Sequence, residues 1–308
     1  MMNVAVLKTN GGFSFENKNI SKPKNDEALI RVLTCAVCTS DMHAWKYGLN
    51  EPTILGHEVV GIVEAVCEND YGIKPGDRVT GCILQGYAEY TTAKISELIL
   101  VPDDFSNTQA IIEPCVCLLS GIRRLKLNSD SKIAIIGCGY MGLCLIALMK
   151  SENINNITAF DLRESQLKLA LNIGAKRAFT PDEIKNEGYA NYDYVFEVAG
   201  TQSAFSLAPQ LVSQYGTIAA VAYHPYVREL DMNLCAAKAF TMVNVFEHRK
   251  ENQLKYMREI IQKIKDKSIA IENLLTHSFP LSRLQEAFTY QSTKDDGYIK
   301  GYINDFKN

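Results

Sequence analysis

The spacing of apolar and polar positions changes character about a third of the way along the chain. Up to about residue 115, short apolar runs alternate with glycine, proline and aspartate turns, and helical periodicity is almost absent. The runs that we expect to be strands are Ala28–Thr34, Glu58–Cys67, Arg78–Cys82 and Tyr87–Thr92. This texture predicts an irregular all-β domain.

The next part of the chain has the order strand, glycine turn, helix, strand. Lys132–Ile136 is rich in isoleucine, residues 137–150 form an apolar stretch of helical length, and Ile157–Phe160 is a second short apolar run. Later apolar runs at Tyr192–Val198 and Thr217–Ala222 are typical of buried strands in a parallel sheet. We therefore expect an α/β fold, with a doubly wound parallel-sheet domain after the β domain.

The domain boundaries are indicated by two helical stretches. Residues 108–127 carry a helical pattern and should bridge the two domains, and an amphipathic helix is expected around Leu254–Ile264. The C-terminal residues are too few for a core of their own and should pack on the first domain. We predict one domain from residues 1–117 with 250–308 and another from 118–249, which suits a chain of 308 residues.

Composition narrows the class of function. The 32 basic and 35 acidic residues are spread without long runs, which gives no reason to expect nucleic acid or a membrane surface as partner. No apolar stretch is long enough to span a bilayer, and the start of the chain lacks the features of a secretory signal. We therefore expect a cytoplasmic protein with a small-molecule partner. The nine cysteines are irregularly spaced, which indicates reduced thiols and no disulfide framework.

A glycine fingerprint comes after the isoleucine-rich strand and opens the apolar helix. It reads Gly137-Cys138-Gly139-Tyr140-Met141-Gly142. The first glycine permits the tight turn, the second lets the backbone approach a pyrophosphate, and the third lets helix and strand pack closely. Tyr140 and Met141 begin the helix, whose N-terminus favours an anion. The alternative is a tight turn without a ligand, but the context favours a dinucleotide.

Asp161 ends the second strand of this unit, 19 residues after Gly142. A carboxylate there can accept both ribose hydroxyls and would repel a 2′-phosphate, so it favours NAD over NADP. Arg163 weakens this preference slightly, and a solvated aspartate is the alternative interpretation.

Candidate metal ligands are scattered through the first domain. Catalytic zinc needs three protein ligands of nitrogen, sulfur or oxygen type and one open position. Cys38, His57 and a glutamate, Glu58 or Glu113, could supply them. A lone cysteine is more often a small buried residue, and a His-Glu pair is more often structural. From composition and spacing alone, a metal site and its absence are equally supported.

The order of the motifs resembles the zinc-containing medium-chain dehydrogenases, sorbitol (polyol) dehydrogenases in particular. The shared motifs are Cys-x-Ser-Asp-x-His-x-Trp from Cys38, Gly-His-Glu at residues 56–58, Lys-Pro-Gly-Asp-Arg-Val from Lys74, Gly-Tyr-Ala-Glu-Tyr from Gly86, Glu113-Pro114, the glycine fingerprint and Thr-His-Ser-Phe-Pro-Leu from Thr276. They span nearly the whole chain. The resemblance implies a GroES-like catalytic domain and a Rossmann cofactor domain.

The resemblance also implies roles for the metal-site residues. Cys38 and His57 would bind the catalytic zinc, and Glu113, favoured over Glu58, would complete its shell or hold its water. Asp41 would orient His57 through its other ring nitrogen.

Two further residues would handle the proton of the alcohol. Ser40 would receive it, and His43 would pass it towards solvent. Each of these residues also has an alternative interpretation. Ser40 could be a turn hydroxyl, His43 an exposed histidine, and Asp41 an aspartate in a turn or at a helix cap.

The chain departs from the family at several places: the stretch after Cys82, Val245–Arg249, Tyr215-Gly216 and His224-Pro225. Many relatives carry a lobe with four cysteines that holds a structural zinc, but here Cys82 is followed almost directly by Gln85-Gly86-Tyr87. One zinc per chain is therefore expected. His224 comes after a strand of the parallel sheet, where ligands bind in such folds, although a loop residue without a ligand is equally supported.

The leading hypothesis is a zinc-dependent oxidoreductase that transfers a hydride between a secondary alcohol and NAD. The alcohol would be a polyol, sugar alcohol or cyclitol, and the product its ketone. The alternatives are a threonine- or aminopolyol-type dehydrogenase on the same zinc site, a zinc-free quinone or enone reductase, and a non-catalytic protein. A homo-oligomer, dimer or tetramer, is expected.

Overall fold

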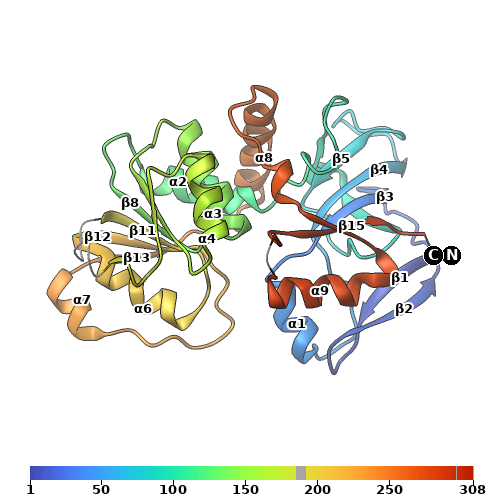
Figure 1. Ribbon diagram of the computed structural model, residues 1–308. Helices are drawn as coiled ribbons and strands as arrows, with labels where there is room; N and C mark the ends of the chain where they lie inside the picture. The colour runs from blue at the N-terminus through green and yellow to red at the C-terminus, as the bar shows by residue number, and fades with distance from the viewer. Residues whose placement is uncertain (185–191, 296, 308) are drawn as a thin grey trace. The chain divides into compact units, whose positions relative to one another are not determined.

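The computed structural model describes residues 1–184, 192–295 and 297–307 and divides into two compact units (Figure 1). Met1–Pro114 and His248–Asn308 form one, called here the β unit, and Cys115–Glu247 form the other, called the doubly wound unit. Each is described by itself.

The doubly wound unit is built on a six-stranded, fully parallel sheet of order β10-β9-β8-β11-β12-β13. Its strands are β8 (Ile133–Ile136), β9 (Ile157–Phe160), β10 (Arg177–Phe179), β11 (Tyr192–Glu197), β12 (Val212–Ala220) and β13 (Thr241–Asn244). The central strand β8 is apolar and buried at all four positions. Such a strand needs cover on both faces of the sheet.

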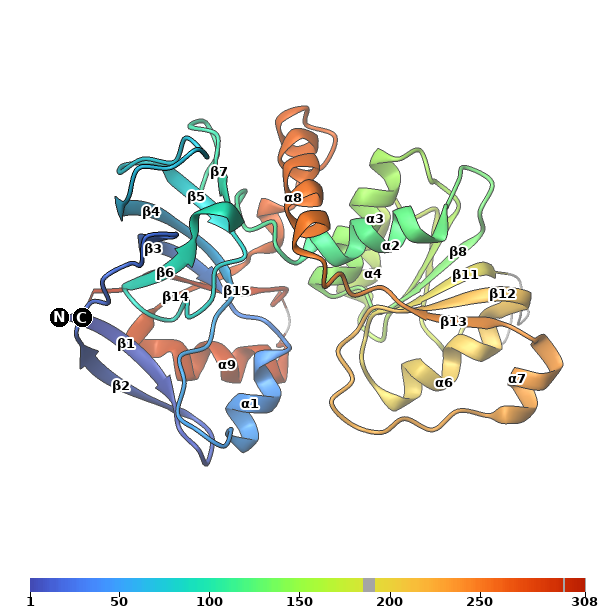
Figure 2. The same ribbon diagram turned by 180° about the vertical axis from the view of Figure 1, so that it is seen from behind.

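Helices supply that cover. In two opposite views, α2 (Cys115–Leu125), α3 (Tyr140–Ser151) and α4 (Glu164–Ile173) lie on one face, and α6 (Gln202–Leu211) lies on the other (Figures 1 and 2). A further short helix, α7 (Met232–Lys238), precedes β13. The reversal of strand order beside β8 puts the carboxyl ends of β8 and β11 at the switch point, where such sheets bind ligands.

The β unit contains a seven-stranded sheet of order β14-β15-β3-β4-β5-β7, with β6 paired to β3, and a separate hairpin of β1 and β2. The strands are β1 (Met2–Leu7), β2 (Phe13–Lys18), β3 (Glu27–Ala36), β4 (Glu58–Val66), β5 (Arg78–Gly81), β6 (Tyr90–Lys94), β7 (Leu98–Leu100), β14 (His277–Pro280) and β15 (Gly301–Asp305). The helices are α1 (Asp41–Tyr47), α8 (Lys250–Lys265) and α9 (Leu284–Thr293), with short 3-10 turns at Ile95–Glu97, Glu272–Leu274 and Leu281–Arg283.

Strand β3 organises this unit. Its side chains alternate between buried and half-buried along most of its length, so one face packs in the core. The end of β3 pairs with both β4 and β15, through Ala36 and Cys35. Segments far apart in the sequence thereby meet at one end of the sheet, and the candidate metal ligands lie there.

The predicted α/β fold, an irregular β domain with a doubly wound parallel sheet, is confirmed, but helix α1 was not expected. Its seven residues bury only Asp41 and Ala44, which is too little for a helical period in the sequence. The helix ends at Gly48, where any side chain would overlap the carbonyl group of Thr9. The expected strand from Tyr87 begins only at Tyr90. In the described residues, every helix is too short or too polar to cross a membrane.

Candidate functional site

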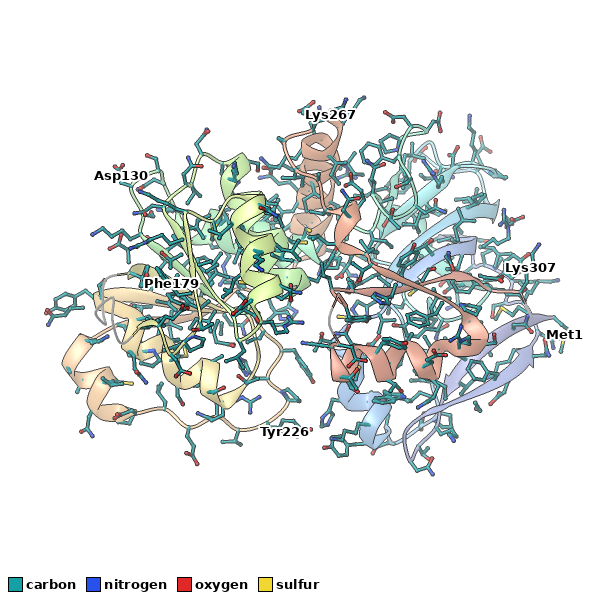
Figure 3. All side chains as sticks on the ribbon, in the orientation of Figure 1. Met1, Asp130, Phe179, Tyr226, Lys267 and Lys307 are labelled. Carbon is teal, nitrogen blue, oxygen red and sulfur yellow. The ribbon has the colours of Figure 1, made fainter. Side chains whose placement is uncertain are left out.

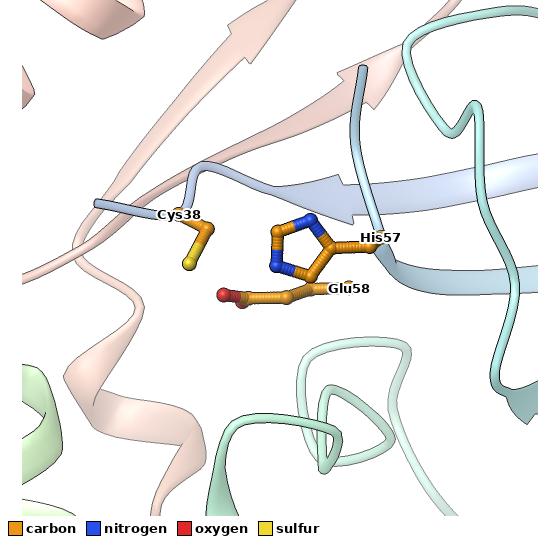
Figure 4. Close-up of side chains that lie close together, drawn as sticks. All are labelled: Cys38, His57 and Glu58. Atoms are coloured by element: carbon orange, nitrogen blue, oxygen red, sulfur yellow. The ribbon is translucent and has the colours of Figure 1, made fainter. Parts of the chain in front are cut away.

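Three candidate metal ligands converge in the β unit. Cys38 comes after β3, His57 precedes β4 and Glu58 is the first residue of β4, and their side chains point towards one another (Figure 4). One ligand atom from each, a sulfur, a ring nitrogen and a carboxylate oxygen, lies within 4.8 Å of the others. This is the only such group among the described residues. Sulfur, nitrogen and oxygen donors of these types are the usual ligands of zinc.

The surroundings of His57 are rich in negative charge. Burial alone would lower the pKa of its imidazole, but a hydrogen bond with Cys38 and the charges of Cys38, Asp41 and Glu113 raise that pKa to about 11. The cluster therefore attracts a positive charge, which a bound Zn²⁺ supplies when the histidine is neutral.

The carboxylate of Asp41 lies beside the imidazole ring of His57. Its Oδ1 lies 3.6 Å from Nδ1 of His57, which leaves Nε2 for a metal. The hydroxyl of Tyr87 lies 3.4 Å from the other carboxylate oxygen of Asp41 and 3.2 Å from the carbonyl oxygen of Ala36. Burial raises the pKa of the Asp41 carboxyl, and the nearby His57 partly offsets this.

Glu58 is held by Lys300, the residue immediately before β15. The Nζ of Lys300 donates hydrogen bonds to Oε1 of Glu58 (2.9 Å) and to the carbonyl oxygen of Val37 (3.1 Å), and both charged side chains are buried. Although burial lowers the pKa of the Lys300 ammonium, the charge of Glu58 raises it overall. The second carboxylate oxygen of Glu58, Oε2, is buried without a hydrogen-bond partner among the described residues. Burying a carboxylate oxygen without a hydrogen bond costs free energy, and a bound metal ion would offset this cost. The residues therefore fit a metal ion.

Glu113 lies in the same environment but outside the close cluster. Burial raises the pKa of its carboxyl to about 7, and the charge of His57 opposes this rise. Its oxygens do not share the 4.8 Å grouping of Cys38, His57 and Glu58. The geometry thus favours Glu58 as the third donor, whereas the sequence favoured Glu113.

The two residues expected to handle the proton follow Cys38 in the chain. The hydroxyl of Ser40 donates a hydrogen bond to Sγ of Cys38 at 3.2 Å. His43 is half-buried on α1, with its ring centroid 4.9 Å from that of Tyr47. Lys300 and Tyr87 were not singled out from the sequence. The only available signal was that lysine is rare in an apolar strand context such as Tyr298 to Ile303.

The glycine fingerprint forms the turn between β8 and α3 in the doubly wound unit. Gly137 has a φ of +101°, and a Cβ there would lie 2.8 Å from the backbone nitrogen of Ala199. A Cβ on Gly142 would overlap the carbonyl group of Gly137, whereas a Cβ on Gly139 would meet nothing within 4 Å. Gly139 therefore borders open space at the start of α3. The backbone of Tyr140 and Met141 begins that helix, with the Tyr140 side chain buried and Met141 half-buried.

Asp161 lies just after β9 and connects it to the glycine turn. One carboxylate oxygen accepts the backbone N–H of Cys138 at 2.8 Å. The other accepts the backbone N–H of Arg163 at 2.9 Å and its Nε at 3.3 Å. The fingerprint, Asp161 and Arg163 thus lie together at the carboxyl edge of the sheet.

Comparisons with known proteins identify the family of this chain. Residues 24–103 match the family model of the alcohol dehydrogenase GroES-like domain, and residues 141–263 match that of the zinc-binding dehydrogenases. The chain belongs to the zinc-containing medium-chain dehydrogenases. Within this family it is sorbitol-dehydrogenase-like, and the expected pairing of a GroES-like domain with a Rossmann domain is confirmed.

Individual relatives span nearly the whole dehydrogenase chain. Sorbitol dehydrogenase of Homo sapiens is 24% identical, over 92% of this chain and 90% of its own. L-threonine 3-dehydrogenase of Bacillus subtilis is 26% identical, over 96% of this chain and 97% of its own. The crystal structure of 2R,3R-butanediol dehydrogenase from Bacillus subtilis superposes with a TM-score of 0.83 at 22% identity, covering 99% of both chains. This last likeness shows the fold.

The connection after β5 is too short to form the structural-zinc lobe that many relatives carry. This strand ends at Gly81 and β6 begins at Tyr90, so eight residues connect them. Cys82, the one cysteine of this connection, has its Sγ 3.1 Å from the side-chain oxygen of Gln253 on α8.

Two glycine substitutions should separate folding of the turn from cofactor binding. Gly139→Ala should fold like the wild-type dehydrogenase, since its Cβ meets open space, but should weaken NADH binding by about tenfold or more because the methyl group fills the approach to the helix N-terminus. Gly142→Ala should instead lower the free energy of unfolding by about 1–3 kcal/mol, because its Cβ overlaps Gly137. Calorimetric titration and denaturant unfolding of both variants check this. Equal behaviour of the two would contradict the assigned roles.

Proposed function

We propose that this dehydrogenase is zinc-dependent and transfers a hydride between a secondary alcohol and NAD. The alcohol is a polyol, sugar alcohol or cyclitol, or the reaction runs from the corresponding ketone. The observation that carries the proposal is the group of Cys38, His57 and Glu58, in which a buried carboxylate oxygen lacks a partner among the described residues. The sorbitol dehydrogenases among the relatives support the substrate class.

In this proposal each residue of the β unit has a separate task. Cys38, His57 and Glu58 would hold one zinc ion, and Glu113 lies close enough for its charge to act on His57. Bound zinc would supply a Lewis acid that lowers the pKa of a substrate hydroxyl. Asp41 keeps the imidazole of His57 oriented, with Tyr87 behind it.

The proton of the alcohol leaves through the chain's own groups. Ser40 Oγ would receive it while releasing its own hydrogen, and the half-buried imidazole of His43 would pass a proton towards solvent. The hydrogen bond from the Ser40 hydroxyl to the sulfur of Cys38 supports this proposed role, because it keeps the hydroxyl next to a proposed metal ligand.

NAD is the proposed cofactor, with NADP as the less favoured one. The carboxylate of Asp161 lies at the edge of the glycine turn, where it can accept the ribose hydroxyls, and would repel a 2′-phosphate. Arg163 beside it reduces that repulsion. A homo-oligomer, dimer or tetramer, stays a prediction.

A threonine- or aminopolyol-type substrate is the second candidate, supported by the L-threonine 3-dehydrogenases among the relatives. It uses the same zinc site, so only the substrate separates it from the first. The zinc-free quinone or enone reductase is less well supported, because such an enzyme has no use for the three converging donors.

A substrate panel before and after zinc removal tests the proposal. Sorbitol, xylitol, myo-inositol, 2,3-butanediol and L-threonine would each be offered with NAD and with NADP. We expect oxidation of at least one polyol with NAD, loss of activity after dialysis against a chelator, and recovery with Zn²⁺ but not with Mg²⁺. Turnover of L-threonine alone would select the second candidate. Activity that survives complete removal of zinc would overturn the zinc-dependent mechanism.

A further inference from the structure

A buried carboxylate, an imidazole and a guanidinium form a chain at the carboxyl ends of β11 and β12. Glu197 is the last residue of β11 and is fully buried. Its Oε1 accepts the backbone N–H groups of Ala199 (3.0 Å) and Gly200 (2.7 Å), and its Oε2 lies 2.8 Å from Nε2 of His224. Every oxygen of this buried carboxylate is thereby satisfied.

Arg228 fixes the tautomer of His224. Nε of Arg228 lies 3.0 Å from Nδ1 of His224. A guanidinium has only donors, so Nδ1 must be the acceptor, and Nε2 carries the hydrogen that Glu197 accepts. The side chain of Arg228 is thus aligned by two buried or half-buried partners, not left to solvent.

Further hydrogen bonds hold Arg228 and its loop in place. Nη2 of Arg228 donates to the carbonyl oxygen of Gly200 at 2.6 Å. The next residue, Glu229, is bound through its backbone to both side-chain atoms of Gln202 on α6, at 3.0 and 2.9 Å. Tyr226 in the same loop projects at the surface of the doubly wound unit (Figure 3).

Arg228 therefore presents a fixed donor. Holding a long side chain in one conformation costs up to about 2 kcal/mol of side-chain entropy. Nη1 has no acceptor anywhere in the described ranges, whereas Nε and Nη2 are both used. An immobilised guanidinium with an unused N–H edge is suited to bind an oxyanion.

The loop after β11, whose Gly200 carbonyl oxygen accepts from the guanidinium, lies against the glycine turn. A Cβ on Gly137 would be 2.8 Å from the backbone nitrogen of Ala199, so the two backbones are in close contact. Gly200, whose carbonyl holds Arg228, is the next residue. The guanidinium is therefore held one residue away from the contact with the turn, on the β11 side of the switch point.

We propose that Arg228 is a phosphate-binding residue at the carboxyl ends of β11 and β12, positioned by Glu197 and His224. The proposal rests on the proposed function, since the dinucleotide is one source of the phosphate. A phosphorylated sugar alcohol is the other. Both present the oxygens that a guanidinium binds in pairs.

The test compares Arg228→Gln and Arg228→Lys with Lys238→Gln as the matched control. Lys238 is a cation of the same unit, held by the carbonyl oxygens of Gln210 and Val212, where β12 begins. Binding of NADH, ADP-ribose and adenosine would be measured by calorimetry or competition. KM would be measured for sorbitol and for sorbitol 6-phosphate.

We expect Arg228→Gln to weaken NADH and ADP-ribose binding about tenfold or more, as loss of a charged hydrogen bond does, with adenosine unchanged. Arg228→Lys should recover part of the loss, and Lys238→Gln should match the wild type. If only the KM for sorbitol 6-phosphate rises, the phosphate belongs to the substrate, and the site stands.

Two results would overturn the site. One is that Arg228→Gln has the same affinities for NADH and ADP-ribose, and the same KM for sorbitol 6-phosphate, as Lys238→Gln. The other is that adenosine binding falls together with ADP-ribose binding, which would give Arg228 a purely structural role. If the wild-type protein binds neither NADH nor adenosine, the proposed cofactor is wrong. This result differs from the two results that would overturn the phosphate site.

Discussion

Replacing Lys300 by methionine is expected to lower the free energy of unfolding of the zinc-free protein by about 3–5 kcal/mol. The substitution keeps an unbranched side chain that is one atom shorter but leaves the buried carboxylate of Glu58 without its paired cation. With zinc bound the loss should be smaller, because the metal supplies positive charge to the same carboxylate. Denaturant unfolding with and without Zn²⁺ measures both values.

Lys300→Arg is the control for this experiment. It keeps the charge and can still donate to Oε1 of Glu58, so it should retain most of the stability. A loss below about 1 kcal/mol for Lys300→Met without zinc would mean that the pair is not important for folding. An equal loss with and without zinc would argue that the metal does not contact Glu58.

Glu58→Gln should weaken zinc binding more than Glu113→Gln does. The amide oxygen of a glutamine at position 58 can still accept the hydrogen bond from Lys300, but the other carboxylate oxygen, which has no partner among the described residues, is replaced by an uncharged amide group. We expect a loss of zinc affinity beyond the roughly 10- to 100-fold that results from removal of an outer-shell partner. Glu113→Gln should stay within that range, because Glu113 acts on His57 through charge.

Competition with a chromogenic chelator gives both affinities. The two variants control for each other, since each removes one carboxylate from the surroundings of the metal ligands. The reverse order of the two affinities would make Glu113 the metal ligand and Glu58 the structural partner of Lys300.

Local signals in the sequence predicted the doubly wound sheet well. Ile157–Phe160 was expected as a strand and is β9, because a short run with three apolar residues out of four between turn signals favours a buried strand. The glycine fingerprint placed the turn between β8 and α3 because the first and third glycines each answer a local steric demand.

Long-range contacts could not be predicted in this way. Lys300 is separated by 242 residues from Glu58, and the pairing of β15 with β3 brings it to the candidate metal ligands. The choice between Glu58 and Glu113 also depends on that packing. Arg228 was missed although His224 is only four residues away in the same loop, because its other partner, Gly200, is 28 residues away and follows a different strand, β11.

The zinc content of each chain tests the central claim most directly. Elemental mass spectrometry would be applied to the purified wild-type protein and to Cys38→Ser, which removes the thiolate donor while nearly keeping the size of the side chain. The account predicts about one zinc per wild-type chain and close to none in the variant. Wild-type protein without zinc, or zinc that is retained by Cys38→Ser, would contradict the assignment of Cys38, His57 and Glu58 as the metal site.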